Sequence, residues 1–185
     1  RTRAAELAAI SGRLPAARVL TGPRATGPAM TSAWDDAQVI YFIGHAVRDA
    51  EVPFSAWLPL AAAASGDPYP GLDLQDVLAA RLDRCRLVVL SGCATGAPYV
   101  DGLTTTPSLG DAFLDAGADA VIQTFWRVRD EGSVVEPQRI LAAWQEDGQD
   151  LTAAVSAERR RAMQGPHGIR HPFDWAAWTV MSAWF

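Results

Sequence analysis

The chain has 185 residues with 16 basic and 21 acidic side chains, so its net charge is −5. Hydrophobic residues make up 49% of it and charged residues 20%, a globular composition that excludes disordered, collagenous and coiled-coil proteins. The acidic balance argues against a nucleic-acid partner, and no apolar run approaches the ~20 residues that cross a membrane.

Length and cysteine usage predict one domain in a reducing compartment. A chain of this size buries about 70% of the surface that its unfolded form exposes, so we expect a single domain over residues 1–185. Two cysteines are too few for a disulfide framework or a zinc site. We therefore expect a cytoplasmic protein without metal or cofactor. The first residues lead into an amphipathic stretch, so no signal peptide is visible. Because the chain starts at Arg1, we expect a fragment, with a regulatory domain or partner upstream.

The first half of the chain predicts two helices and one buried strand. Helical spacing of apolar residues indicates helices, and runs of β-branched and aromatic residues indicate buried strands. In chain order, the pattern predicts a helix over residues 4–11, a short apolar run over 16–20, a helix over 29–37 capped by Thr31 or Ser32, and a strand over 38–43. Prolines make residues 46–72 irregular, with at most an edge hairpin near 56–62.

The second half alternates strands and helices. The pattern predicts a helix over 73–82, a strand over 86–90, a loop over 96–107, a helix capped by Ser108 and closed by Gly117, a strand over 118–125, helices over 134–144 and 152–163, and a last strand within 175–185. The Gly, Thr and Pro content of the 96–107 loop predicts a mobile segment.

This alternation indicates an α/β fold with a mainly parallel sheet and helices on both faces. In such sheets, active residues lie just past the carboxyl ends of the strands. Two chemically reactive residues occupy that position, because His45 follows the strand over 38–43 and Cys93 follows the strand over 86–90.

These two residues suit nucleophilic catalysis. A thiolate attacks, and an imidazole takes the thiol proton and later protonates the leaving amine. We expect the two side chains to face each other at neighbouring strand ends. The tetrahedral intermediate also needs donors for its oxyanion, and the backbone N–H groups of Cys93 and Ala46 are the candidates.

The remaining cysteine and histidines have structural interpretations. Cys85 precedes its strand between two arginines, and we expect it to be a packed or half-exposed thiol. A disulfide between Cys85 and Cys93 would bend the strand between them, so we discount it. His167 and His171 lie in a Gly- and Pro-rich turn and are expected to be structural or at the surface.

Residues 39–45 (VIYFIGH) and 87–96 (LVVLSGCATG) place a histidine 48 positions before a cysteine. These two blocks resemble the catalytic blocks of the CHAT domain. The caspase signature has a similar spacing of about 50. Further blocks match in order over about residues 15–185: Gly102-Leu103, 111–118 (DAFLDAGA), 121–130 (VIQTFWRVRD) and 171–178 (HPFDWAAW). The family comprises caspase-like cysteine peptidases related to caspases and separases.

The resemblance implies a caspase-like three-layer α/β/α sandwich in which His45 is the base and Cys93 the nucleophile of a dyad. Two residues depart from the family pattern, since Ala46 stands where the family has Gly and Gly92 stands where it has Ala. Ala46 keeps its backbone N–H, so the oxyanion site can survive, although the methyl group would crowd the substrate.

The resemblance also implies a protein or peptide substrate and residues that bind it. Trp126 and Asp130 match a family block beside the cleft, and a substrate strand is expected to pair with a sheet edge near residues 124–130. Asp130 in the specificity pocket would favour a basic residue before the cut. Arg24, in a loop that we expect to follow a first strand, would favour an acidic residue, and both possibilities stay open.

Other classes of protein fit less well. A class I glutamine amidotransferase needs His-x-Glu after the cysteine, a cysteine phosphatase needs Arg six residues after it, and a dinucleotide-binding domain needs a glycine fingerprint. The sequence has none of these. The remaining alternative to a bacterial cysteine endopeptidase in a regulatory or defence pathway is a catalytically inactive CHAT domain that acts as a protein-interaction module.

Overall fold

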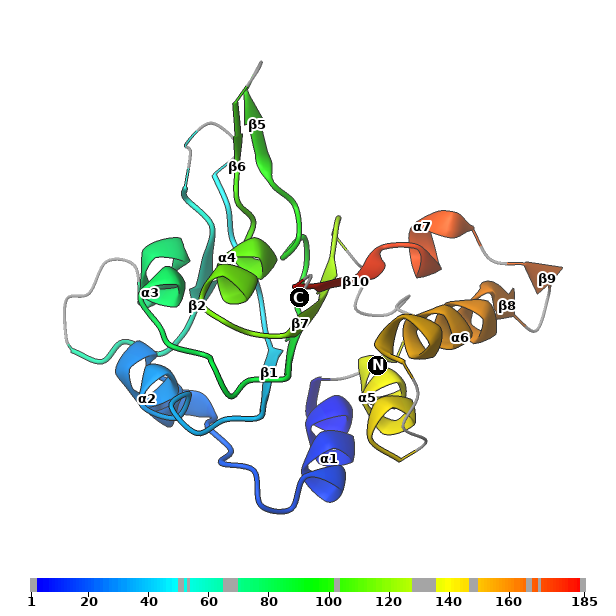
Figure 1. The fold of residues 1–185 in the computed structure, drawn as a ribbon, viewed down its shortest axis with the longest axis horizontal. Coiled ribbons are helices and arrows are strands. Elements are labelled where there is room, and N and C mark those ends of the chain that lie inside the picture. The colour runs from blue at the N-terminus through cyan, green and yellow to red at the C-terminus, as the bar shows by residue number, and fades with distance from the viewer. Residues whose placement is uncertain are drawn as a thin grey trace.

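A four-stranded sheet forms the centre of the molecule (Figure 1). The computed structural model describes residues 3–49, 52, 54–64, 70–101, 104–127, 136–146, 150–165, 168–169 and 171–183. The strands are β1 (Val39–Ile43), β4 (Leu87–Ser91), β7 (Ala120–Thr124) and β10 (Trp178–Ser182), in the order β1-β4-β7-β10. The first three run parallel and β10 is antiparallel to β7. This confirms the mainly parallel sheet.

The two central strands are buried on both faces. Every residue of β7 is buried, and so are the first four residues of β4. The apolar runs over residues 87–90 of β4 and 120–122 of β7 are typical of parallel strands that carry helices on both sides. Because successive side chains point to opposite faces, Val88 and Leu90 join one core while Leu87 and Val89 join the other.

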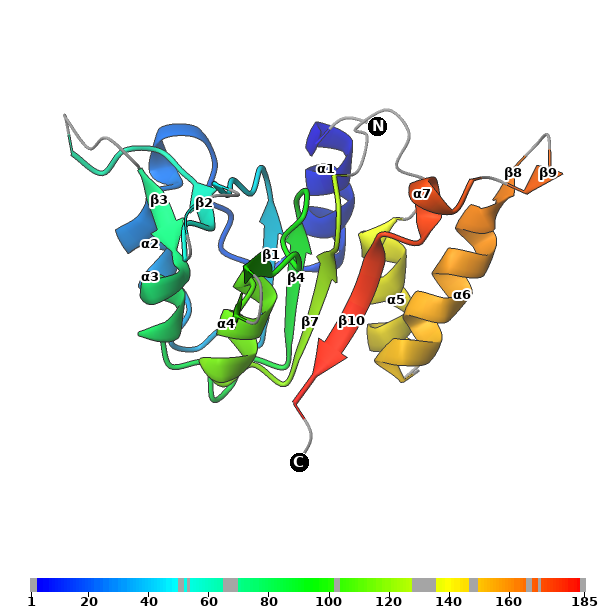
Figure 2. The ribbon, with the colours of Figure 1, turned by 90° about the horizontal axis from the view of Figure 1, so that it is seen from above.

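One face of the sheet is covered by α3 (Leu74–Leu78) and α4 (Leu109–Asp115) (Figure 2). Both helices begin with a capping box, in which the side chains of Asp73 and Ser108 accept from backbone N–H groups of the first turn. Phe113 of α4 is fully buried here, and burial of such a side chain contributes about 1.5–3 kcal/mol.

The opposite face is covered by α1 (Arg3–Arg13), α5 (Pro137–Glu146) and α6 (Leu151–Met163). Ile10 of α1, Ile140 of α5 and Val155 of α6 pack on Val89 and Ile122 in one buried cluster. These helices and those of the first face complete the three layers of an α/β/α sandwich, as the sequence predicts.

Smaller elements surround the sheet. They are η1 (Gly22–Arg24), α2 (Gly27–Thr31), β2 (Trp57–Pro59), β3 (Gly71–Asp73), β5 (Tyr99–Asp101), β6 (Thr104–Thr106), β8 (Gln164–Gly165), β9 (Gly168–Ile169) and α7 (Pro172–Trp175). The antiparallel pair β5–β6 projects from the body of the molecule (Figure 1). The expected loop over 96–107 therefore contains a hairpin, which its β-branched threonines favour.

Three further predictions need correction. The helix expected at 29–37 is α2, which starts earlier because the Thr26 hydroxyl accepts from the Ala29 N–H at 3.3 Å and Pro28 fits the first turn. The helix expected over 73–82 ends at Leu78, and the Leu82 N–H instead donates to the Ala116 carbonyl at the end of α4. The apolar run over 16–20 forms neither helix nor strand, so Arg24 precedes the first strand of the sheet.

Candidate active site

His45 and Cys93 follow neighbouring parallel strands at equivalent positions. Ile43, the last residue of β1, pairs with Ser91, the last residue of β4, and the Gly44 N–H donates to the Ser91 carbonyl at 3.1 Å. His45 and Cys93 each come two residues later, so the 48-residue spacing is the register of the strand pair. The side chain of His45 is exposed and Cys93 is half-buried. Both residues lie at the sheet edge where the sequence predicts them.

Hydrogen bonds join the turn that carries Cys93 to the end of β7. The Thr124 hydroxyl donates to the Gly92 carbonyl at 2.6 Å, and the Thr124 N–H donates to the Thr95 hydroxyl oxygen at 3.1 Å. The Gly96 N–H donates to the Thr124 carbonyl at 2.9 Å. Bonds on both sides of Cys93 therefore come from one residue at the end of β7.

The backbone of this turn is strained directly after the cysteine. Ala94 has a φ of 54°, in the left-handed region that costs a residue with a Cβ about 1–2 kcal/mol. Its N–H donates to the Trp126 carbonyl at 3.3 Å, which helps to hold this conformation. Strain of this kind persists where the surroundings fix it and is common at functional sites.

Gly92 brings the two strand ends into close approach. A Cβ at residue 92 would lie 3.1 Å from the Gly44 carbonyl oxygen and 3.6 Å from the Ala46 nitrogen. The backbone of Ala46 thus lies beside the cysteine turn, and within the described part of the chain no group accepts from its N–H. This geometry suits the Ala46 N–H as a donor toward an oxygen atom near Cys93.

Arg3, at the start of α1, contacts the imidazole of His45. A terminal guanidinium nitrogen of Arg3 lies 3.1 Å from Nδ1 and 2.7 Å from Nε2. A guanidinium only donates hydrogen bonds, so the ring nitrogen that it contacts acts as an acceptor. The imidazole of His45 therefore uses its lone pair to accept from Arg3. A histidine that acts as a base needs this same lone pair to take a proton.

Of the expected substrate-binding residues, the structure brings Trp126 to the cysteine turn. Besides accepting from Ala94, Trp126 donates its ring N–H to the Phe173 carbonyl at 3.1 Å and stacks on the Phe173 ring with centroids 6.0 Å apart. Arg24 is exposed on η1, and no described contact joins it to His45 or Cys93. Asp130 lies outside the described residues.

The expected pairing of a substrate strand near residues 124–130 needs correction. Thr124 pairs with Trp178 of β10, and the Phe125 N–H donates to the Ala177 carbonyl at 3.0 Å. The chain's own last strand therefore occupies this side of β7, so an incoming strand finds no free backbone at residues 124 and 125. Residues 128–130 lie outside the described part of the chain.

The structural interpretations of Cys85 and His171 are confirmed. Cys85 is buried, and this burial raises the pKa of its thiol to about 11. The two cysteines form no disulfide. His171 is exposed and caps α7, where its Nδ1 accepts from the Phe173 N–H at 3.1 Å. His167 lies outside the described residues.

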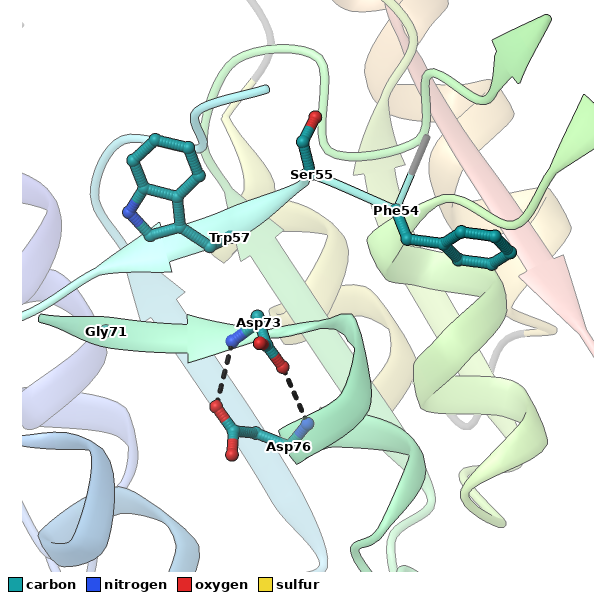
Figure 3. A pocket seen from close by; sticks show the side chains of 6 residues that line it. All are labelled: Phe54, Ser55, Trp57, Gly71, Asp73 and Asp76. Carbon is teal, nitrogen blue, oxygen red and sulfur yellow. Dashed lines mark hydrogen bonds between the residues drawn. The ribbon is translucent and has the colours of Figure 1, made fainter. Parts of the chain in front are cut away.

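A shallow pocket of about 280 Å³ lies beside the segment that follows His45 (Figure 3). It is linked to that segment because Trp57 in its wall exchanges two backbone hydrogen bonds with Val47. Its two carboxylates, Asp73 and Asp76, each accept from the other's backbone N–H at the start of α3, as the dashed lines in Figure 3 show. They serve as helix caps, and no described contact connects them to Cys93.

The described part of the chain contains no cluster of three His, Cys, Asp or Glu side chains that could hold a metal ion. None of its helices combines the length and the apolar composition that a bilayer crossing requires.

Several residues at this site are not singled out by the sequence. Arg3, Thr95 and Thr124 act through contacts with residues 29 to 42 positions away. Arg48, three residues after His45, donates to the carbonyls of Ala97 and Pro98 and so links the segments that follow β1 and β4. The one available signal was a threonine at the end of a buried strand, where a hydroxyl needs a partner.

A known protein-family model matches almost the whole chain. The model of the CHAT domain matches residues 2–183. The chain belongs to the CHAT domain family. This family consists of caspase-like cysteine peptidases, and the α/β sandwich of the chain is consistent with that fold. No curated protein sequence matches the chain.

Proposed function

We propose that this CHAT domain is a cysteine endopeptidase that uses His45 and Cys93 as a catalytic dyad. The observation that supports it most is their equivalent position at the ends of paired strands β1 and β4, two residues after the last pair of the register. The strained, anchored turn after Cys93 adds to this support.

The proposed reaction proceeds through a thioester. His45 takes the proton of Cys93, and the sulfur attacks the scissile carbonyl carbon. The tetrahedral oxyanion accepts hydrogen bonds from the backbone N–H groups of Cys93 and Ala46. His45 then protonates the leaving amine, the C–N bond breaks, and a water activated by His45 hydrolyses the thioester to release the acid.

The substrate is a protein or peptide. Trp126 and Phe173, stacked beside the cysteine turn, offer it an apolar wall. Asp130 and Arg24 remain the alternatives for recognising the charge of the residue before the cut. We place the reaction in a bacterial cytoplasmic regulatory or defence pathway.

A second candidate function is a catalytically inactive interaction module. The contact between Arg3 and the ring nitrogens of His45 favours it, because a base held in this way accepts no proton from Cys93. The two functions differ in whether Cys93 reacts with a peptide.

The test is cleavage of a peptide library, read by mass spectrometry. We expect Cys93→Ala and His45→Ala each to abolish cleavage, while the melting temperature stays within a few degrees because neither side chain is fully buried. Cys85→Ala and His171→Asn are matched controls that should keep cleavage, the second because Asn also caps a helix. Full activity in Cys93→Ala or His45→Ala would contradict the dyad.

A further inference from the structure

Thr124 is a fully buried polar residue whose side chain and backbone all bond to the cysteine turn. Its hydroxyl donates at 2.6 Å to the Gly92 carbonyl, which belongs to the same peptide unit as the Cys93 N–H. A peptide unit is planar and trans, so its C=O and N–H point in opposite directions. Fixing the Gly92 carbonyl therefore fixes the direction of the Cys93 N–H.

This arrangement directs the Cys93 N–H toward β1, the strand that precedes His45. β4 lies between β7 and β1, and Thr124 draws the Gly92 carbonyl toward β7. The Cys93 N–H then points toward the β1 side, where the Ala46 nitrogen would lie 3.6 Å from a Cβ at residue 92. The two candidate oxyanion donors are thus brought to the same side of the turn.

The local backbone does not hold this orientation by itself. Gly92 has no Cβ to restrict its rotation, and Ala94 is in a left-handed conformation with a cost of its own. A flip of the Gly92–Cys93 peptide would break the Thr124 hydroxyl bond and leave the buried hydroxyl without that partner, which is unfavourable. The Thr124 hydroxyl therefore stabilises one orientation of the Gly92–Cys93 peptide.

We propose that Thr124 is a positioning residue that locks the Gly92–Cys93 peptide with its N–H aimed at the oxyanion. This inference rests on the proposed peptidase function. It adds to that function a residue on β7 that touches neither substrate nor the reacting sulfur and acts through the backbone of Cys93.

The test compares Thr124→Val, which keeps the shape and removes the hydroxyl, with Thr124→Ser, which keeps the hydroxyl. With a peptide substrate taken from the library, we expect kcat of Thr124→Val to fall at least about tenfold at a nearly constant KM, below the ~10²–10³ lost when an oxyanion donor itself is removed. Thr124→Ser should restore kcat to within about threefold.

A second readout separates positioning from collapse of the turn. Alkylation of Cys93 by iodoacetamide displaces iodide at a saturated carbon and forms no oxyanion, so its rate should agree within about twofold among wild type, Thr124→Val and Thr124→Ser. Thr106→Val, which removes the hydroxyl of another buried threonine, is the matched control and should keep kcat. If Thr124→Val does not fold, Thr124→Ala removes the same hydroxyl and takes its place.

Three results would overturn the inference: unchanged kcat in Thr124→Val, failure of Thr124→Ser to restore it, or a parallel loss of iodoacetamide reactivity. Absence of Cys93-dependent hydrolysis in the wild type would instead overturn the proposed function. The two failures are therefore distinguishable in one set of proteins.

Discussion

The two cysteines of the chain differ mainly in burial. Cys93 is half-buried at the strand end, whereas Cys85 has 1% of its surface exposed and donates to the Leu87 carbonyl at 3.6 Å. Burial disfavours the thiolate, so the pKa of the Cys85 thiol rises from its ordinary value of 9.0 to about 11. Cys85 therefore stays a thiol under conditions in which an exposed cysteine ionises.

This raised pKa predicts a loss of stability in alkali. Between pH 9 and pH 11 the unfolded chain releases the Cys85 proton while the folded chain keeps it, so the free energy of unfolding falls as the pH rises through this window. Urea unfolding at pH 8, 9 and 10 measures the effect. The decrease from pH 8 to 10 should be smaller in Cys85→Ala than in the wild type, and an equal decrease in both proteins would contradict the assignment.

At this scale, residues that end a buried run could be predicted from the sequence, whereas their partners could not. His45 and Cys93 each follow a strand whose apolar pattern is unambiguous, so their place at the sheet edge follows from the α/β rule alone. Thr124 and Arg3 reach the site only through packing of distant segments. The substrate-strand pairing expected near residues 124–130 was wrong at Thr124 and Phe125, because the pairing of β10 with β7 depends on tertiary structure.

Among the elements, α1 has the most direct bearing on the site. Ile10 is buried against the sheet, and Glu6 accepts from the Tyr41 hydroxyl at 2.7 Å, so α1 packs along β1. This packing brings Arg3 to His45 at the carboxyl edge of the sheet, near which Figure 2 shows the start of α1.

Removal of the Arg3 side chain should raise peptidase activity. In Arg3→Ala the acceptor nitrogen of the His45 imidazole loses a competing donor and becomes available to the Cys93 proton, so kcat/KM for the library peptide should increase several-fold. Arg13→Ala, at the other end of the same helix, is the matched control and should leave the rate unchanged. A decrease in Arg3→Ala would show instead that Arg3 supports the base or the substrate.

Elements with strong local signals were predicted well, and short ones were not. The helix capped by Ser108 and closed by Gly117 was confirmed because its capping box and the positive φ of its glycine are encoded locally. β2 and β3 are three residues each, and their pairing joins Leu58 to Leu72 across a long connection. No local pattern specifies such a pair, since its register depends on the core beneath it.

On the scale of the whole molecule, two buried clusters hold the sheet that positions the site. One lies under α3 and α4 and the other under α1, α5 and α6, and both include side chains of β4. Because β4 is packed on both faces and paired on both edges, its end is a rigid platform for Cys93. The sequence predicted this layered arrangement because apolar strands and amphipathic helices alternate along the chain.

The central claim, a reactive cysteine activated by a histidine, is tested most directly by covalent trapping. The protein is incubated with a peptidyl acyloxymethyl ketone at neutral pH, and the modified residue is identified by intact mass and peptide mapping. We predict one adduct per chain, on Cys93, with none on Cys85, no adduct in Cys93→Ala, and strongly slowed labelling in His45→Ala. Labelling of Cys93 that is equally fast with and without the imidazole of His45 would contradict the account.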